Sequence, residues 1–136
     1  MTFKPEGFAH SELMGAEFVG FDEVSQTITM NFCAPEVFIT PRKSVQGGLV
    51  AGFLDEAMGW AYTCSTGGTH SPLMLDVTFS LLKPVPQGPL SATGRVVKSG
   101  RRVVFLEAEL FSEDGKTLLA RSTSTAIPTE NPGIMP

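Results

Sequence analysis

Paired cysteines and clustered histidines are both missing from this sequence. The chain has 136 residues and only two cysteines, Cys33 and Cys64, and neither belongs to a spacing motif. A disulfide scaffold is therefore excluded, and we expect two reduced thiols in the core of a cytoplasmic protein. His10 and His70 stand far from any group of metal ligands, so we expect no metal and no other cofactor. His10 is predicted at the surface and His70 in a loop.

Positive charge and long apolar runs are also scarce. The chain carries 10 Lys and Arg against 14 Asp and Glu, a net charge of −4, which argues against non-specific nucleic-acid binding. No apolar run reaches the roughly 20 residues of a membrane span, and the N-terminus lacks the apolar segment of a signal peptide. A hydrophobic content of 42% suits one domain with a real core, which we place over residues 1–136.

The most distinctive stretch is the apolar run 45–64. From Leu49 to Cys64 nearly every residue is apolar or small, and such a run predicts a helix that is buried on all sides. Asp55 and Glu56 interrupt it in the middle. Because a buried carboxylate is costly unless it is paired, hydrogen-bonded or protonated, we expect one of these acids to have a chemical role.

Helical geometry separates the two acids. At about 100° per residue, Gly48, Gly52, Asp55 and Gly59 fall within about 60° of one another. Glycine is unfavourable in a helix, so a glycine stripe suggests that another backbone or a ligand passes close by. Asp55 faces this crowded stripe. Glu56 lies about 100° further round, which predicts a position at the rim of the site.

The remaining sequence is typical of strands joined by turns. Residues 34–44 hold two prolines and form a loop, and Gly67-Gly68 ends the helix. The predicted strands span 16–22, 24–32, 73–82, 90–98, 103–112 and 117–127. A tight turn at residues 22–23 joins the first two, the last three form an antiparallel meander, and the tail 128–136 frays.

This element order predicts an α+β fold in which an antiparallel sheet wraps around one long central helix. The wrapped sheet would still leave the glycine stripe open. A second subunit is its natural cover, so we expect a homodimer or a dimer of dimers.

The run Gln46-Gly47-Gly48 is followed by an acid, Asp55, nine positions after Gln46. This motif resembles that of the hotdog-fold acyl-CoA thioesterases, in particular the branch related to phenylacetic acid degradation within the 4-hydroxybenzoyl-CoA thioesterase superfamily. Later stretches also resemble the family, and the likeness covers roughly residues 16–127. These stretches are 75–79 with 83–84, 100–102, and 114–116 with 119–120.

The resemblance implies roles for individual residues. Asp55 matches the acid that activates water or attacks the thioester, and Gly47 matches the glycine whose backbone N–H polarises the thioester carbonyl. Gln46 stands where the family usually has His, and it can donate a hydrogen bond but cannot titrate. Gly48, Glu56 and Met74 are expected to line the substrate site. The resemblance also implies an acyl-CoA substrate, which would be hydrolysed to a free acid and coenzyme A.

Two further positions depart from the family pattern. Many members carry a hydroxyl residue one turn after the acid or on the next strand, where this chain has Gly59 and Met74. Neither side chain can orient a water molecule. A non-catalytic acyl-CoA binding protein therefore remains an alternative, as does another hotdog enzyme such as an acyl thioester hydratase or dehydratase, although no His is evidently placed for that chemistry.

The other polar candidates keep two interpretations each. Asp55 is either the catalyst or a helix acid exposed at an edge. Lys98, Arg101 and Arg102 cluster at one hairpin, which is either a solvated turn or a mouth that holds the phosphates of coenzyme A. Asp76 is expected to make a structural hydrogen bond. The acyl group stays undetermined, because the large apolar residues either line a pocket or belong to the core. These residues are Phe53, Trp60, Met74 and Phe79.

Overall fold

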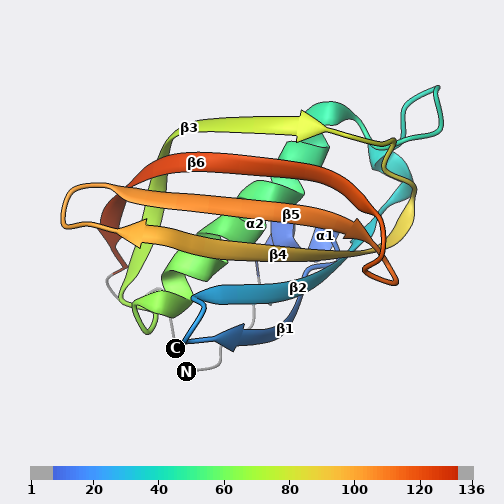
Figure 1. The fold of residues 1–136 in the computed structure, drawn as a ribbon. Coiled ribbons are helices and arrows are strands. Elements are labelled where there is room, and N and C mark those ends of the chain that lie inside the picture. Colours follow the sequence, from blue (N-terminus) through green and yellow to red (C-terminus); the bar gives the residue numbers. More distant parts are fainter. Residues whose placement is uncertain (1–7, 132–136) are drawn as a thin grey trace.

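One long helix lies across a curved six-stranded sheet in the computed structural model, which describes residues 8–131 (Figure 1). The helix is α2 (Gly47–Ser65), and all neighbouring strands are antiparallel in the order β1-β2-β4-β5-β6-β3. A short helix α1 (Ala9–Leu13) precedes the sheet, and a 3₁₀ turn (Glu36–Phe38) lies before α2. The strands are β1 (Glu17–Asp22), β2 (Thr27–Ala34), β3 (His70–Leu81), β4 (Gly88–Ser99), β5 (Val104–Ser112) and β6 (Leu118–Glu130). The predicted α+β fold is confirmed.

The core fills the space between α2 and the concave face of the sheet. Alternate residues of β2, β4 and β5 are buried, as a strand with one covered face requires. On α2 the buried residues recur at helical spacing, among them Phe53, Leu54, Ala57 and Met58. The buried face of α2 packs against the buried faces of these strands in one apolar layer, which holds the helix on the sheet.

The helix approaches β4 most closely at Gly94. A Cβ atom at this position would lie 2.3 Å from the backbone oxygen of Ala57 and 3.1 Å from the backbone nitrogen of Met58. Both contacts are with backbone, which cannot move aside as a flexible side chain would. Glycine at this position therefore sets the distance between helix and sheet.

The prediction that α2 is buried on all sides is wrong for the single chain. The sheet covers only one face of the helix, and Gly48 and Asp55 on the other face are exposed. The glycines of the stripe have separate neighbours. A Cβ on Gly48 would lie 3.0 Å from Gln46 Oε1, one on Gly52 would lie 3.2 Å from Met14 Cε, and one on Gly59 would meet nothing within 4 Å.

Two strand boundaries differ from the sequence prediction. The first turn is longer than expected, and β2 begins at Thr27, because the Val24 N–H donates to Asp22 Oδ1 and Gln26 adopts a φ of 54°. At the other end, β6 continues to Glu130, which pairs with His70 at the start of β3. His70 is thus in a strand and not in a loop. The frayed tail was predicted too early, and residues 132–136 lie outside the described range.

The two cysteines have different surroundings. Cys64 is buried as expected, and burial raises the pKa of its thiol to about 12, which keeps it protonated and unreactive. Cys33 is exposed, so its predicted place in the core is wrong. It falls on the outer-facing alternation of β2, between the buried Phe32 and Ala34.

Within residues 8–131, no helix combines the length and the apolar character that crossing a bilayer takes. The same residues contain no cluster of three or more His, Cys, Asp or Glu side chains placed to hold a metal ion.

Gly94→Ala should lower the free energy of unfolding by about 3 kcal/mol, because the added methyl overlaps the α2 backbone and forces the helix away from β4. Chemical denaturation of the variant and the parent measures this. Gly20→Ala on β1 is the matched control, since a Cβ there meets nothing within 4 Å, and it should change stability by less than about 0.5 kcal/mol. Equal stability of the two variants would contradict the close approach.

Candidate active site

The N-terminus of α2 presents unpaired backbone donors. Gln46 caps the helix, and its Oε1 accepts a hydrogen bond of 3.0 Å from the Leu49 N–H. The side chain lies over Gly48, where a Cβ would crowd it. Within the described residues, no acceptor lies on the N–H of Gly47, the first residue of the helix. A free N–H at a helix N-terminus, with its partial positive charge, suits a developing oxyanion.

A cavity of about 520 Å³ opens beside the middle of α2. Three of the predicted site residues, Asp55, Glu56 and Met74, line it together. Gly59 lines it too, where its missing side chain leaves open space. The cavity therefore lies between one face of α2 and the start of β3, with its apolar walls around two adjacent carboxyl groups.

Asp55 is the carboxyl group whose titration this environment changes. Desolvation raises its pKa above the usual value for Asp, the neighbouring charge of Glu56 raises it further, and His10 opposes both. Asp55 is exposed in the single chain, and it lines the cavity together with apolar residues such as Trp60 and Met74. A raised pKa makes the carboxylate a stronger base than one in water.

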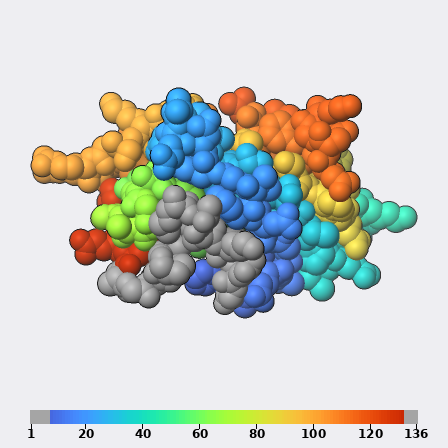
Figure 2. All heavy atoms as spheres, turned by 90° about the horizontal axis from the view of Figure 1, so that it is seen from below, coloured from blue at the N-terminus to red at the C-terminus, as the bar shows by residue number. Residues whose placement is uncertain are grey.

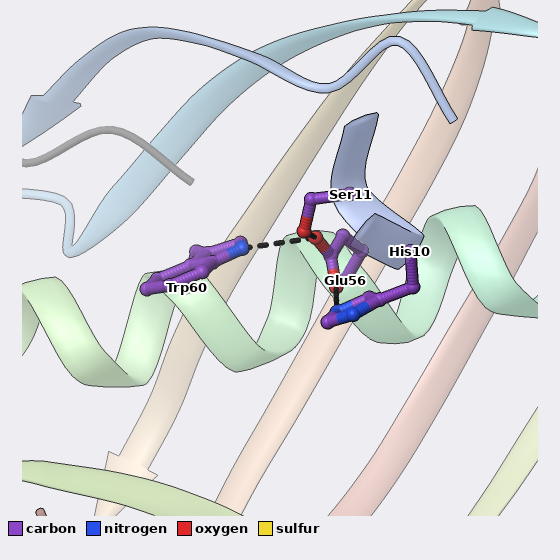
Figure 3. Close-up of polar contacts among 4 residues, drawn as sticks. All are labelled: His10, Ser11, Glu56 and Trp60. Carbon is purple, nitrogen blue, oxygen red and sulfur yellow. Dashed lines mark hydrogen bonds and ion pairs between the residues drawn. The ribbon is translucent and has the colours of Figure 1, made fainter. Parts of the chain in front are cut away.

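Glu56 is held by three donors that converge on its carboxylate (Figure 3). The Ser11 hydroxyl and the Trp60 indole N–H, at 3.1 Å, both donate to Oε2. His10 Nε2 lies 3.4 Å from Oε1, an ion pair when the ring is protonated. The sequence placed Glu56 at the rim. It does line the cavity, but α1 covers it and its side chain is only 11% exposed.

Sequence reasoning missed the contribution of α1 and of two hydroxyl groups. The side chain of His10 is 64% exposed, as a surface residue should be, yet it also lines the cavity beside Phe8. Thr63 and Ser71 line the cavity as well, and donate to the Gly59 oxygen at 2.9 Å and to Asn131 Oδ1. Nothing in the sequence links residue 10 to residue 56.

Strand β3 supplies the opposite wall. Met74 lines the cavity, and its sulfur accepts a hydrogen bond of 3.0 Å from the Ser124 hydroxyl. Asp76 accepts from the Thr125 N–H at 3.1 Å, so its predicted structural hydrogen bond is confirmed. Among the large apolar candidates, Trp60 lines the cavity, whereas Phe53 is fully buried in the core.

The other predicted site residues lie apart from this cavity. Lys98, Arg101 and Arg102 are exposed at the hairpin between β4 and β5, and none of them lines the cavity. Figure 2 shows this hairpin and the loop that precedes α2 projecting from opposite ends of the molecule. Gln46 and Gly47 follow that loop, so one chain does not bring them to Asp55.

The fold matches many solved structures, although no curated protein sequence matches the chain at a significant level. A phenylacetic acid degradation-related protein from Ralstonia eutropha JMP134 has a TM-score of 0.80 at 28% identity, with 88% of this chain and 89% of that chain covered. The PaaI protein from the Escherichia coli phenylacetic acid degradation operon has a TM-score of 0.80 at 18% identity, with 93% and 88% covered.

A third similar structure carries a ligand. A Streptococcus mutans UA159 protein bound to acetyl-CoA has a TM-score of 0.73 at 18% identity, with 85% of this chain and 90% of that chain covered. These likenesses confirm the predicted hotdog fold. The sequence model of the thioesterase superfamily matches residues 43–119, more than half of the chain and the span that holds α2 with both carboxyl groups. The chain belongs to the thioesterase superfamily.

Proposed function

We propose that this protein hydrolyses acyl-CoA thioesters, with Asp55 as the general base or nucleophile. The observation that carries the proposal is Asp55 itself, which lines the cavity and has a carboxyl group with a raised pKa. Family membership supports a hydrolase of this class. A similar structure bound to acetyl-CoA supports the choice of ligand.

The chemistry needs a base on one side of the thioester carbonyl and donors on the other. Asp55 takes a proton from water as the water oxygen attacks the carbonyl carbon. The negative charge that develops on the carbonyl oxygen is stabilised by the Gly47 N–H at the start of α2, while Gln46 can donate a hydrogen bond beside it. The C–S bond then breaks, the free acid leaves, and the proton passes to the coenzyme A thiolate. In the nucleophilic variant Asp55 attacks directly and water hydrolyses the resulting anhydride.

A complete site takes two subunits in this proposal. Gly47 and Asp55 are eight residues apart on α2, roughly 12 Å along the helix axis, so one carbonyl does not reach both in the same chain. Two α2 helices that run antiparallel across a two-fold axis bring each N-terminus to the middle of the partner helix. The chain offers a surface for this. Strand β3 is a sheet edge that exposes Leu73, Leu75 and Leu81.

The hairpin cations are the proposed contact for the coenzyme A nucleotide. Lys98, Arg101 and Arg102 are exposed and lie away from the acyl cavity, as groups that hold the distal phosphates of a long substrate should. Gly48 lies at the crowded start of α2. Because it has no side chain, the thioester of the substrate can approach the backbone donors of this turn.

A second candidate function is the hydration of an unsaturated acyl thioester. One observation favours it: the His10 imidazole and the Glu56 carboxylate are paired 3.4 Å apart in the cavity. A histidine and an acid are the groups that hydration and dehydration use for proton transfer. Loss of the enoyl absorbance of crotonyl-CoA would favour this function, and thiol release from saturated acyl-CoAs would favour hydrolysis.

Asp55→Asn should lower kcat for thiol release by about a hundredfold or more, as loss of a general base does. The parent's activity should rise with pH through the raised pKa of Asp55, because only the deprotonated carboxylate accepts a proton. The fold should be no less stable. Burial disfavours the charged form, so charged Asp55 opposes folding above that pKa, and Asn removes this cost. Glu113→Gln, an exposed acid of the β5–β6 turn, is the control. Near-normal thiol release from Asp55→Asn would refute the assignment.

Reversing the charges of Arg101 and Arg102 should raise KM for acyl-CoA at least about tenfold, because repulsion replaces attraction to the phosphates. The same variant should leave KM unchanged for pantetheine thioesters, which lack the nucleotide. Lys116→Glu, an exposed cation of the β5–β6 turn, controls for net charge. Equal effects on both substrate types would count against a nucleotide contact at this hairpin.

Mixing two inactive variants tests the shared site. Asp55→Asn removes the base, and Gly47→Pro removes the N–H at a helix start, where proline is well tolerated. In a mixed dimer one site inherits both lesions and the other neither, so random re-pairing should restore about a quarter of the parent activity. No recovery, with mixed dimers shown to form by native mass spectrometry, would mean that each subunit builds its own site.

A further inference from the structure

Helix α1 is attached to the middle of α2 by contacts of different kinds. The Met14 methyl group, just after α1, lies where Gly52 leaves room, 3.2 Å from the position of a Cβ at that glycine. The backbone oxygen of Met14 also accepts a hydrogen bond of 2.8 Å from the Cys33 N–H of β2. These contacts hold the C-terminal end of α1 on both the helix and the sheet.

Glu56 provides the polar attachment. Its carboxylate joins donors from two helices, since Ser11 and His10 belong to α1 and Trp60 belongs to α2 (Figure 3). The Ser11 side chain is buried, and that of Glu56 nearly so, which strengthens hydrogen bonds to the charged group. Removing the carboxylate would leave the buried Ser11 hydroxyl without its acceptor, which is costly. Glu56 therefore fixes where the N-terminal end of α1 lies.

This attachment places aromatic rings on the cavity wall. The Phe8 ring, at the N-cap of α1, has its centroid 6.0 Å from that of Trp60 and 6.2 Å from that of His10. All three side chains line the cavity that contains Asp55. The distances are those of favourable aromatic pairs, so the three rings form a continuous wall.

We propose that Glu56 is a positioning residue that holds Phe8 against Trp60, and that this wall sets the largest acyl group the cavity admits. The proposal rests on the proposed function and adds the part of the chain that selects the substrate. Two of the three rings, Phe8 and His10, come from the α1 segment, outside the span that the family model matches, whereas Trp60 and Asp55 lie on α2 within it. The rings select substrates by the cavity volume that they leave for the acyl group. The size of residue 8 should therefore decide which acyl groups fit.

Substitutions at Phe8 in both directions test the wall. Phe8→Ala should raise the ratio of kcat/KM for decanoyl-CoA over acetyl-CoA by about tenfold, and Phe8→Trp should lower it. Glu56→Leu removes the acceptor, which Gln would keep, and should raise the ratio in the same sense. Adding it to Phe8→Ala should change the ratio little more, because both substitutions act on one wall. If Phe8 had only a structural role, its substitutions would lower stability without shifting this ratio in opposite directions. Phe105→Ala, a partly exposed ring on the outer face of β5, and Glu113→Leu are matched controls.

A binding measurement separates this proposal from the proposed function. Trp60 is the only tryptophan of the parent chain, so intrinsic fluorescence reports on the wall directly in the parent and in Phe8→Ala, and isothermal titration calorimetry is used for Phe8→Trp, which adds a second indole. Titration with the non-hydrolysable thioethers S-ethyl-CoA and S-decyl-CoA gives a Kd ratio for each Phe8 variant, which should follow the kinetic ratio.

The outcomes are distinct. If the parent hydrolyses acyl-CoA but neither Phe8→Ala nor Phe8→Trp changes the ratio of kcat/KM for decanoyl-CoA over acetyl-CoA, the proposal that this wall selects acyl size is overturned. The proposed function would still stand. A parent that releases no thiol, but whose thioether Kd ratio shifts in opposite directions in the two variants, would support the wall and overturn hydrolysis. Neither thiol release nor thioether binding by the parent would overturn both.

Discussion

The contact between α2 and β4 at Gly94 is the constraint on which the rest of the structure depends. A helix can lie this close to a strand only where the strand has no side chain, because the nearest atoms belong to the helix backbone. The contact holds the middle of α2 on the sheet, and Ala57 at this point directly follows the two acids. The covered face of α2 is thereby turned to the core, and Asp55 is turned to the open face. A small change in this spacing would move the cavity walls relative to each other.

Two adjacent carboxylates on one helix acquire opposite properties from their surroundings. Glu56 accepts from two donors and pairs with His10, which commits it to holding α1 in place. Asp55 accepts no hydrogen bond from the described residues, and desolvation raises its pKa. A carboxylate without donors stays available as a base, whereas one with its acceptor sites occupied is a structural group. The negative charge of Glu56 also raises the pKa of Asp55, so the structural acid assists the proposed base.

The chain separates its functional groups along α2. The free donors are at the N-terminus of the helix, the proposed base Asp55 and the cavity are near its middle, and the cationic hairpin projects from the other end of the molecule. A substrate such as acyl-CoA is long and has an acyl group, a reactive carbonyl and phosphates in series. The exposed apolar side chains at the β3 edge are the surface through which the proposed second subunit would bring these groups to one substrate.

The sequence by itself determined the architecture and the helix that lines the cavity. Strand alternation and one long apolar run with two acids predicted the sheet, the helix and the position of Asp55, because periodicity depends on which face is buried. The motif that begins at Gln46 pointed to the right family. Only the tertiary structure decided that α2 is half open, that His70 is in a strand, that Cys33 is exposed, and that α1 covers Glu56. The physical reason is separation along the chain. Residues 10, 11 and 56 meet through packing of distant segments, and no local pattern records such a contact.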